Sequence, residues 1–259
     1  MRRFYLPPEQ CQGGSLVLTG SEAHHARHVL RLRLDERVTV LDGAGHDFRC
    51  KVDGFERDAV RLAVEEKLFH PHPPGRVTLL QAVPKGRLME DVIQKATELG
   101  VFRIVPLLSE RVVAHLDSRE AAHKTAKWQL VAREAIKQCG SAWLPVVEAP
   151  VSLSELLGRN EGFELPLLAS LGSGSRSPRD YFGAFNAKRG RMPQSVCAWV
   201  GPEGDFTPGE TEAIRSSGAL PITLGPLVLR TDTAAIYCLS VINYELHASA
   251  PAQTPASPP

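Results

Sequence analysis

Residues Gly201–Phe206 read GPEGDF, and residues Leu224–Ala234 read LGPLVLRTDTA. Each stretch is a glycine-containing loop that follows a short apolar run, and the second one carries Arg230 at the start of an apolar helical pattern. Gly201 and Gly204 allow positive φ values and a close approach of the backbone. Because parallel α/β sheets bind ligands beyond the carboxyl ends of their strands, two such loops and a cation predict a small-molecule pocket.

The residues that follow each loop predict helix starts. Thr207–Glu210 reads TPGE, which is a capping box with proline at the first helical position. Thr231 is the expected N-cap of the last helix, so Arg230 lies where backbone N–H groups already favour negative charge. An arginine stays protonated and can stabilise an anion that forms during a reaction. The alternative is a surface arginine paired with Asp232 or Glu203.

The surrounding sequence from residue 76 onward predicts a mainly parallel α/β sheet, because short apolar runs alternate with helical patterns. The expected strands are 77–83, 102–107, 165–170, 196–201 and 222–224. The expected helices are 89–99 ended by Gly100, 121–139 ended by Gly140, 207–217 and 231–247.

The first 70 residues predict a small β-rich module. The expected strands are 38–41, 48–55 and 59–64, and Ser21 is expected to cap one short helix with Ala23, Ala26, Val29 and Leu30 on its apolar face. Proline-rich residues 71–75 predict a linker. The expected domains are therefore 1–70, a linker at 71–75, a larger domain at 76–248, and a disordered tail at 249–259.

Composition fits a globular protein, with 43% apolar and 23% charged residues among 259. The formal net charge is +1, so no overall basic field indicates a nucleic-acid partner. A local basic patch is present, because residues 1–34 contain five arginines and two glutamates, with three histidines nearby. This patch is either a solvated surface or an RNA-binding surface.

Several classes of site are not supported by the sequence. The five cysteines are scattered and form no CxxC pair, and the two histidines of the linker are too few for a metal site. Cys139, Cys197 and Cys238 fall in apolar periodic segments and are expected in the core. Free thiols, the lack of an apolar signal segment and the lack of a run of about 20 apolar residues indicate a soluble, cytoplasmic protein.

Phosphate-binding motifs are also missing, because the chain has neither GxxxxGK[ST] nor GxGxxG after a strand. Residues 172–175, GSGS, are interpreted as a flexible loop. A ligand held by backbone edges, such as an adenine or a methionine group, therefore fits the two loops better than a nucleotide phosphate does.

Several motifs, in this order, resemble the RsmE-type ribosomal RNA methyltransferases of the SPOUT class. They are Lys85, Lys95–Val101, Ser109–Arg111, Arg133–Gly140, GPEGDF and LGPLVLRTDTA, preceded by His24-His25, His28–Arg31 and Asp42–Gly45. The resemblance extends over nearly the whole chain, to about His247.

The resemblance implies an enzyme that uses S-adenosylmethionine to methylate N3 of one uridine in 16S (small-subunit) ribosomal RNA. It also implies a homodimer, a deep trefoil knot in the C-terminal domain, and an N-terminal PUA-like β-barrel that anchors RNA. Arg230 is then the catalytic residue that faces the uridine. The implied cofactor-binding residues are Gly201, Pro202, Glu203, Gly204, Leu224, Gly225, Leu229, Arg230 and Ala234. The expected RNA-binding residues are Arg2, Arg3, His25, Arg31 and Arg33.

Two residues depart from the family's usual pattern. Asp205 stands where the family commonly has a second glycine, and Ser141 stands where it often has an arginine. The proton acceptor for N3 is left open between Glu203, a water molecule and a residue of a partner subunit. Two alternative functions also stay open, namely a transfer RNA methyltransferase of the same fold and a non-catalytic RNA-binding module.

Overall fold

The computed structural model describes residues 2–111, 117–172 and 174–248. These residues form two compact units, one made of 2–72 with 133–144 and the other made of 73–111, 117–132, 145–172 and 174–248. The division at 72/73 falls within the proline-rich segment. Helix α3 (Ser118–Cys139) contributes its first part to the second unit and its last turns to the first. The tail expected at 249–259 lies outside the described residues.

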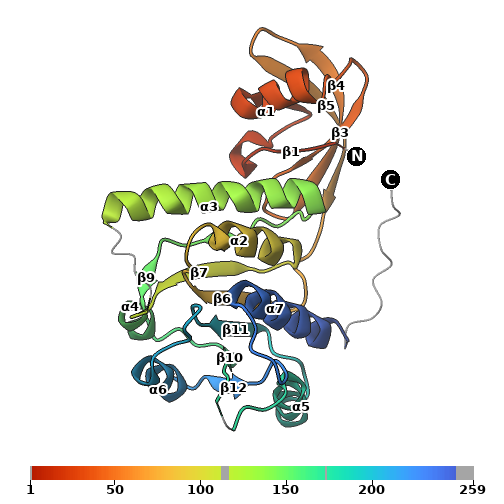
Figure 1. Ribbon diagram of the computed structural model, residues 1–259. Coiled ribbons are helices and arrows are strands. Elements are labelled where there is room, and N and C mark those ends of the chain that lie inside the picture. Colours follow the sequence, from red (N-terminus) through yellow and green to blue (C-terminus); the bar gives the residue numbers. More distant parts are fainter. Residues whose placement is uncertain (1, 112–116, 173, 249–259) are drawn as a thin grey trace. The chain divides into compact units, whose positions relative to one another are not determined.

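The first unit is built on a five-stranded sheet in the order β1-β3-β4-β5-β2, in which only β1 and β3 are parallel (Figure 1). Its strands are β1 (Arg3–Tyr5), β2 (Ser15–Thr19), β3 (Arg37–Leu41), β4 (His46–Phe55) and β5 (Ala59–Phe69). The three expected strands are present, whereas β1 and β2 were not expected. Alternate side chains of the strands, such as Phe4, Leu18 and Val40, form the buried core.

The short helix of the first unit differs from its prediction. It begins at Gly20 as α1 (Gly20–His24) and continues as a π-helical turn over His25–Val29, after a 3₁₀ turn at Pro8–Gln10 earlier in the chain. Ser21 is therefore a helical residue and not the cap. Ala23 and Ala26 are buried as expected, but Val29 is exposed, because it lies in the π-helical turn, whose i→i+5 hydrogen bonds change the side-chain spacing from that of an α-helix.

The second unit contains a seven-stranded, entirely parallel sheet in the order β12-β10-β11-β6-β7-β8, with β9 paired to β7, which confirms the predicted fold class. The strands are β6 (Arg76–Ala82), β7 (Arg103–Leu108), β8 (Val146–Val147), β9 (Val151–Ser152), β10 (Leu165–Ala169), β11 (Ser195–Val200) and β12 (Leu220–Ile222). The helices, besides α3, are α2 (Leu88–Glu98), α4 (Leu153–Gly158), α5 (Pro178–Arg189), α6 (Pro208–Ser216) and α7 (Thr231–Ala248).

Helices cover both faces of this sheet. Helix α7 packs on β6 and β11 and lies beside α2 and α5 (Figure 1), whereas α4 and α6 share an apolar core with the opposite face. Strand β6 shows the alternation, since Leu80 and Ala82 belong to the core with α4 and α6 while Gln81 reaches α7. Elements β8, β9, α4 and α5 were not expected.

The glycines predicted to end two helices do so. Gly100 follows Leu99, the C-cap of α2, and Gly140 follows Cys139, the last residue of α3; their φ values of 75° and 83° are the left-handed conformation of a C′ glycine. Because all strands of the sheet are parallel, the loops that follow them meet at one edge, which is the carboxyl edge of the sheet.

The cysteines divide into buried and exposed groups. Cys197 and Cys238 are buried as expected, but Cys139 is exposed, because it is the last residue of α3 and no further turn continues its apolar stripe. All five cysteines are free thiols. Within the described ranges, no helix is long and apolar enough to cross a membrane.

Candidate functional site

A cavity of about 550 Å³ lies at the carboxyl ends of β10, β11 and β12. Its walls come from the loops that follow these strands and from the first turn of α7. Seven of the nine residues expected to bind the cofactor line it: Gly201, Pro202, Glu203, Leu224, Gly225, Leu229 and Ala234. Gly204 and Arg230 do not line it. The structure thus brings the two motif loops together, while the binding role of each residue stays a prediction.

The loop after β11 turns at Asp205, the residue that departs from the family pattern. Asp205 has a φ value of 60°, and its backbone N–H donates to the carbonyl of Pro202 at 2.9 Å. Its carboxylate Oδ1 accepts a hydrogen bond from the backbone N–H of Phe206 at 2.8 Å. Aspartate enters the left-handed region more readily than most residues, so the aspartate side chain can replace a glycine here.

Gly201 and Gly204 do not use the positive φ values that glycine allows. Gly201 is required for the close approach of the backbone that a glycine also allows. A Cβ atom there would lie 2.7 Å from Asp205 Oδ1 and 3.1 Å from the backbone nitrogen of Phe206. In the second loop the left-handed backbone occurs at Gly225, with a φ value of 107°. The loop after β11 therefore depends on close approach, and the loop after β12 depends on backbone conformation.

A buried hydrogen-bond chain fixes the cavity wall. The hydroxyl of Thr231 donates to the carbonyl of Gly201 at 2.6 Å and accepts from Nε2 of Gln81 at 3.0 Å. Gln81 also donates to the carbonyl of Ala82 at 2.9 Å. Both Gln81 and Thr231 are buried. Three segments that are distant in the sequence are thus joined, namely the end of β6, the loop after β11 and the start of α7.

The start of α7 is one residue earlier than expected for a helix capped by Thr231. Thr231 is the first helical residue, and the carbonyl of Arg230 accepts from the backbone N–H of Ala234 at 2.8 Å. Arg230 therefore occupies the cap position itself. Its side chain is exposed, and within the described residues it forms no ion pair or hydrogen bond, so the alternative pairing with Asp232 or Glu203 does not occur.

The capping box after the first loop is confirmed. The hydroxyl of Thr207 accepts from the backbone N–H of Glu210 at 3.2 Å, and the carboxylate of Glu210 accepts from the backbone N–H of Thr207 at 2.8 Å. The other oxygen of Glu210 accepts from the backbone N–H of Glu110 at 2.8 Å. The box therefore also ties the segment after β7 to α6.

The chemical character of the cavity follows from its lining. Its charged lining residues are the carboxylates Glu203 and Asp205, and no lysine, arginine or histidine is found among the described residues that line it. Leu224, Leu229 and Val200 add apolar surface. Such a cavity does not favour a phosphate group, and it suits a ligand with an apolar part and a positive charge.

One segment of this site was missed by the sequence analysis. The loop after β10 lines the cavity through Ser170, Leu171, Gly172, Gly174 and Ser175. The hydroxyl of Ser175 donates to the carbonyl of Gly172 at 2.9 Å. The sequence signal was the position of this GSGS run directly after an expected strand, because the loops after parallel strands gather at one edge.

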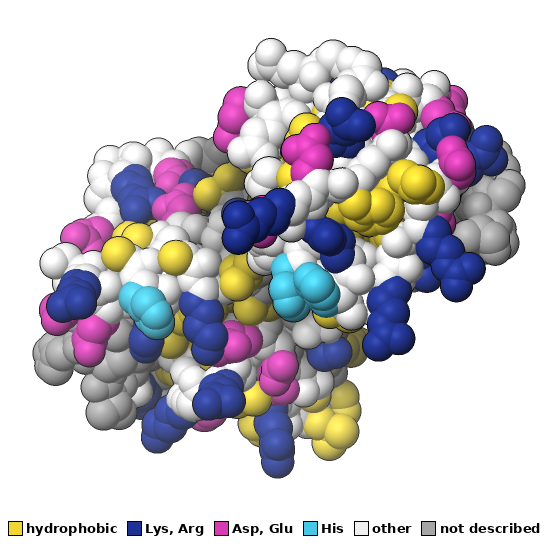
Figure 2. Space-filling view, turned by 90° about the horizontal axis from the view of Figure 1, so that it is seen from above, with side chains coloured by type: hydrophobic (Ala, Val, Ile, Leu, Met, Phe, Trp, Pro, Cys, Tyr) yellow, Lys and Arg dark blue, Asp and Glu magenta, His cyan; other side chains and the backbone are white. Residues whose placement is uncertain are grey.

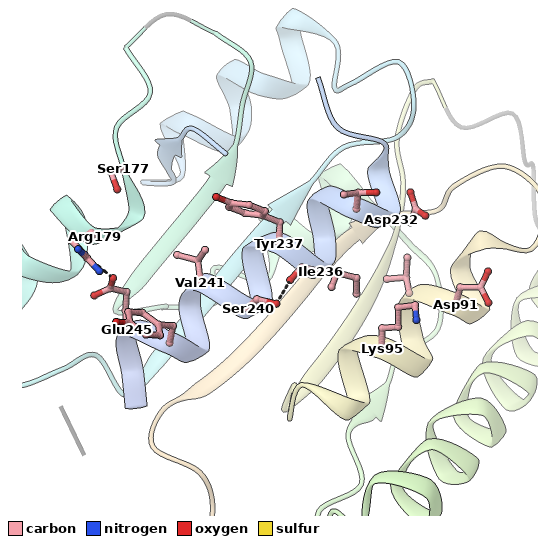
Figure 3. A pocket seen from close by; sticks show the side chains of 13 residues that line it. Asp91, Lys95, Ser177, Arg179, Asp232, Ile236, Tyr237, Ser240, Val241 and Glu245 are labelled. Atoms are coloured by element: carbon pink, nitrogen blue, oxygen red, sulfur yellow. Dashed lines mark hydrogen bonds and ion pairs between the residues drawn. The ribbon is translucent and has the colours of Figure 1, made fainter. Parts of the chain in front are cut away.

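A groove of about 790 Å³ runs along α7 on the sheet face that α7 covers. Figure 3 shows α7 with Tyr237 and Val241 between α5, which carries Arg179, and α2, which carries Asp91 and Lys95. Tyr237 is 46% exposed. The groove begins at Asp232 and Thr233, in the same helical turn whose other residues line the cavity.

The residues expected to bind RNA have different environments in the first unit. Arg2, Arg31 and Arg33 line one shallow hollow, in which Arg2 is paired with Glu36. The side chains of Arg31 and Arg33 are exposed and form no ion pair within the described residues. Figure 2 shows basic side chains interleaved with acidic ones and not gathered in a single block.

Arg3 and His25 do not line that hollow. Arg3 donates to the carbonyls of Gln138 at 3.0 Å and Lys137 at 3.4 Å, so it bonds the last carbonyls of α3. His25 lies edge-on to Phe4, with ring centroids 6.2 Å apart. Ser141, the second departure from the family pattern, makes a local turn by donating to the carbonyl of Trp143 at 2.9 Å.

Comparison with known proteins identifies the family. Residues 71–243 match the RNA methyltransferase domain, and residues 18–65 match the RNA methyltransferase PUA domain. The ribosomal RNA small subunit methyltransferase E of Bacillus subtilis (strain 168) is 32% identical over 251 residues, which cover 95% of this chain and 97% of that protein. The protein of the same name from Aquifex aeolicus (strain VF5) is 32% identical over 244 residues, covering 93% and 99%.

A solved structure agrees with these relatives. The ribosomal RNA small subunit methyltransferase E from Neisseria gonorrhoeae, bound to S-adenosyl methionine, superposes with a TM-score of 0.80 at 27% identity, covering 93% of this chain and 96% of that one. The resemblance seen in the sequence motifs is thereby confirmed. The chain belongs to the ribosomal RNA small subunit methyltransferase E family.

Proposed function

We propose that this protein transfers the methyl group of S-adenosylmethionine to N3 of one uridine in 16S ribosomal RNA, on the small subunit or its near-complete precursor. One observation carries the proposal: the two motif loops meet at a cavity on the carboxyl edge of a parallel sheet, and no described cation lines that cavity. The proposed methyltransferase domain is 76–248, and the proposed RNA-anchoring domain is 1–70.

The cavity fits S-adenosylmethionine in size and in character. Its volume of about 550 Å³ is that of a small-molecule site. The backbone edges of the loops after β11 and β12 are suited to an adenine, and the carboxylates of Glu203 and Asp205 suit a ligand with cationic groups. When bound, S-adenosylmethionine supplies an electrophilic methyl group. The residues proposed to hold it are the seven expected residues that line the cavity, which leaves out Gly204 and Arg230.

Arg230 is proposed to act on the uracil. N3 of uracil carries a proton at neutral pH, so methylation requires negative charge to develop on the base and its carbonyl oxygens. Arg230 directly follows the loop that lines the cavity. Its guanidinium is exposed and has no partner within the described residues. It can therefore stabilise that charge, and it also keeps the base in position for transfer.

The first unit is proposed to anchor RNA through its basic hollow. Arg31 and Arg33 have free guanidinium groups there, which suit contacts with phosphates. Arg2 can contact a phosphate there only if its ion pair with Glu36 opens. The match to an RNA methyltransferase PUA domain over residues 18–65 supports this assignment. Arg3 and His25, which lie outside the hollow, are proposed to contribute only by holding this unit in shape.

The groove along α7 is proposed to bind a second copy of this chain. It combines the exposed aromatic rings of Tyr237 and Tyr244 with both signs of charge, since Lys95 and Arg179 lie there with Asp91. A surface of this kind can be complementary to itself, as a two-fold interface requires. Because the groove shares a turn of α7 with the cavity, a docked copy would also border the cofactor site.

Sedimentation velocity tests the dimer. The native chain is expected to sediment as a dimer, and a Tyr237→Glu, Tyr244→Glu variant is expected to be a monomer with an unchanged circular dichroism spectrum. A native monomer at micromolar concentration would contradict this part of the proposal.

Two further features belong to the proposal. The trefoil knot of the SPOUT class is compatible with the bond between Thr231 and Gly201, because this bond fixes the start of the last helix to the loop after β11. A cytoplasmic location is supported by the five free cysteines.

The deciding experiment incubates the protein with labelled S-adenosylmethionine and small subunits from cells that lack the modification, and then maps the labelled base. Label on N3 of one uridine in 16S RNA is expected. Label on transfer RNA in a parallel reaction would favour the transfer RNA methyltransferase. Calorimetric titration that detects no binding of S-adenosylmethionine would favour a non-catalytic module.

A further inference from the structure

A second hollow, here called the basic groove, lies beside the cavity on the same edge of the sheet. Its volume is about 510 Å³. It is formed by the loop after β6, the start of α2, the segment after β7, the first part of α3, and the loop after β11. The basic groove is defined by six basic side chains that line it: Lys85, Arg87, Arg111, His123, Lys124 and Lys127.

Most of the positive charge in the basic groove is not neutralised. Lys85, Arg87 and Lys124 form no ion pair with any described residue, and Lys127 pairs with Glu90. The guanidinium of Arg111 donates to the backbone carbonyls of Gly204 and Asp205 and, among the described residues, to no carboxylate. The two carboxylates of the lining, Glu90 and Glu203, therefore face five lysine and arginine side chains. A concave surface with this excess of one charge attracts a polyanion.

The floor of the basic groove is apolar. Trp128 and Met89 line it and are both buried, so they offer a surface but little mobility. Cations at the rim and an apolar floor suit a nucleotide chain, whose phosphates are anionic and whose sugars and bases carry apolar faces. This composition is the opposite of the cavity, where no described cation is found.

The basic groove and the cavity share one wall. Pro202 and Glu203 line both hollows, and Glu203 accepts a hydrogen bond from the backbone N–H of Lys85 at 2.9 Å. The strand order explains this arrangement, because β11 lies between β10 and β6 in the sheet. A chain bound in the groove is thus separated from the cofactor cavity by a single loop.

We propose that the basic groove binds the phosphodiester backbone of the substrate RNA next to the target nucleotide. This inference rests on the proposed function, and it adds a site in the methyltransferase unit to the RNA anchor proposed for the first unit. Lys85, Arg87 and Lys124 act as positioning residues, since they do not line the cofactor cavity. They hold the flanking phosphates so that the base reaches the far side of the shared wall.

The test is a Lys85→Gln, Arg87→Gln, Lys124→Gln variant in the full chain. Each phosphate contact to a single strand contributes about 0.7 to the slope of log Kd against log salt, so three lost contacts lower the slope by about 2 and raise Kd for RNA about 50-fold at about 0.15 M salt. The KM for small subunits rises accordingly, with a much smaller change in kcat. The affinity for S-adenosylmethionine, measured by calorimetry, stays within about twofold of the native value.

Two further variants separate a groove from a general effect of charge. Lys188→Gln, Arg189→Gln, Arg215→Gln removes three exposed cations that do not line the groove and form no ion pair within the described residues. This variant should keep most of its affinity for RNA. Lys85→Arg, Lys124→Arg keeps both charges and should bind RNA within about threefold of the native protein.

The outcomes distinguish this inference from the proposed function. If the native protein methylates small subunits while the glutamine variant of the groove binds RNA with native affinity and salt slope, the groove inference is overturned and the function stands. Equal losses in the groove variant and in the Lys188 variant also overturn it. If the native protein binds RNA, loses that binding in the groove variant and yet methylates nothing, the groove stands and the proposed function does not.

Discussion

The cavity and the basic groove lie on the same edge of one sheet and share one loop, yet they are built differently. The cavity is made of backbone edges, apolar side chains and two carboxylates, and its lining comes from loops with distinctive local sequences. The groove is made of cationic side chains that come from three separate segments. The comparison shows that a site built from loop backbone is coded in continuous stretches of sequence, whereas a site built from collected charges is spread over separate segments.

Because the cavity is built from loop backbone and the groove from charges, ligand binding in the two hollows should respond to different changes. The cavity should respond to changes that disturb the shape of a loop, and it should respond little to salt. The groove should respond to charge and salt, and it should tolerate changes of shape at its exposed lysines. Arg230 lines neither hollow, so it provides a third case.

The largest effect is expected for Arg230→Ala. Removing one group that stabilises charge in a transition state typically lowers kcat about 100- to 1000-fold. The affinity for S-adenosylmethionine should change less than about threefold, because the side chain of Arg230 does not line the cavity. Single-turnover methylation of small subunits and calorimetry measure the two quantities. Arg230→Lys keeps the charge without the planar guanidinium, so its kcat should lie between those of the native protein and the alanine variant. A native rate for the alanine variant would remove Arg230 from catalysis.

Gly201→Ala should impair the cavity next most strongly. The added Cβ would lie 2.7 Å from Asp205 Oδ1, so the loop must shift. Overpacking of this kind costs about 1–3 kcal/mol, which corresponds to about a 5- to 150-fold loss of affinity for S-adenosylmethionine. Calorimetric titration measures this loss.

Gly209→Ala is the matched control for that change. Gly209 lies in the first turn of α6, and the side-chain atom nearest to its added Cβ, beyond its chain neighbours, would be Oγ1 of Thr207 at 4.0 Å. The affinity of the Gly209→Ala variant for the cofactor should equal that of the native protein. Equal affinity in both variants would show that the shape of the loop at Gly201 does not matter to the cavity.

The sequence predicted the parts of this molecule that are coded locally. The capping box at Thr207, the C′ glycines at Gly100 and Gly140, and the parallel sheet follow from short motifs and periodicity, and the structure has them. Helix α5 was not predicted, because Phe182 and Pro178 are its only buried residues and its apolar periodicity is weak.

Features that depend on tertiary contacts were not predictable. The need for glycine at residue 201 comes from the side chain of Asp205, whose position depends on the folded loop. The anchor between Gln81 and Thr231 joins residues 150 positions apart. The basic groove is of the same kind, since Lys85 and Lys124 come together only when the sheet is assembled. Motifs and periodicity in a single sequence do not reveal which distant residues come together in the folded protein.

Thr231→Val tests whether the shared edge depends on that anchor. Valine keeps the volume but removes the hydroxyl, which leaves the carbonyl of Gly201 without its donor and one N–H of Gln81 without its acceptor. Leaving a buried polar group unpaired costs about 1–3 kcal/mol, so the free energy of unfolding should fall by about 2 kcal/mol in urea titration. Thr231→Ser keeps the hydroxyl and should lose less than half of that. A valine variant as stable as the native protein would show that the anchor is dispensable.

The smallest effect concerns charges at the opposite end of strand β7. Arg103, at the amino end of the strand, pairs with Glu161 and with Glu148 at 3.0 Å, and Arg159 pairs with Glu148 at 2.8 Å. The hydrogen bond from Arg103 lowers the pKa of Glu161 below its ordinary value of 4.5, against the opposing effect of its partial burial. These charges are compensated, in contrast to those of the basic groove, so they should contribute to stability and not to RNA binding.

Glu161→Gln should therefore reduce the free energy of unfolding by about 1 kcal/mol at neutral pH and leave RNA affinity unchanged. Because the pKa of Glu161 is lower in the folded state than in the unfolded state, its stabilising effect is complete above about pH 4.5 and is lost as the pH falls through the folded pKa. Urea titrations between about pH 3 and 7 should show the two proteins converging at the acid end. Glu212→Gln, at an exposed carboxylate without an ion pair among the described residues, should match the native protein at every pH. If the difference in the free energy of unfolding between the native and Glu161→Gln proteins stayed constant down to pH 3, the ionised carboxylate would not be what stabilises this end of the strand. The contrast with the basic groove would then lie in the position of the charges and not in their compensation.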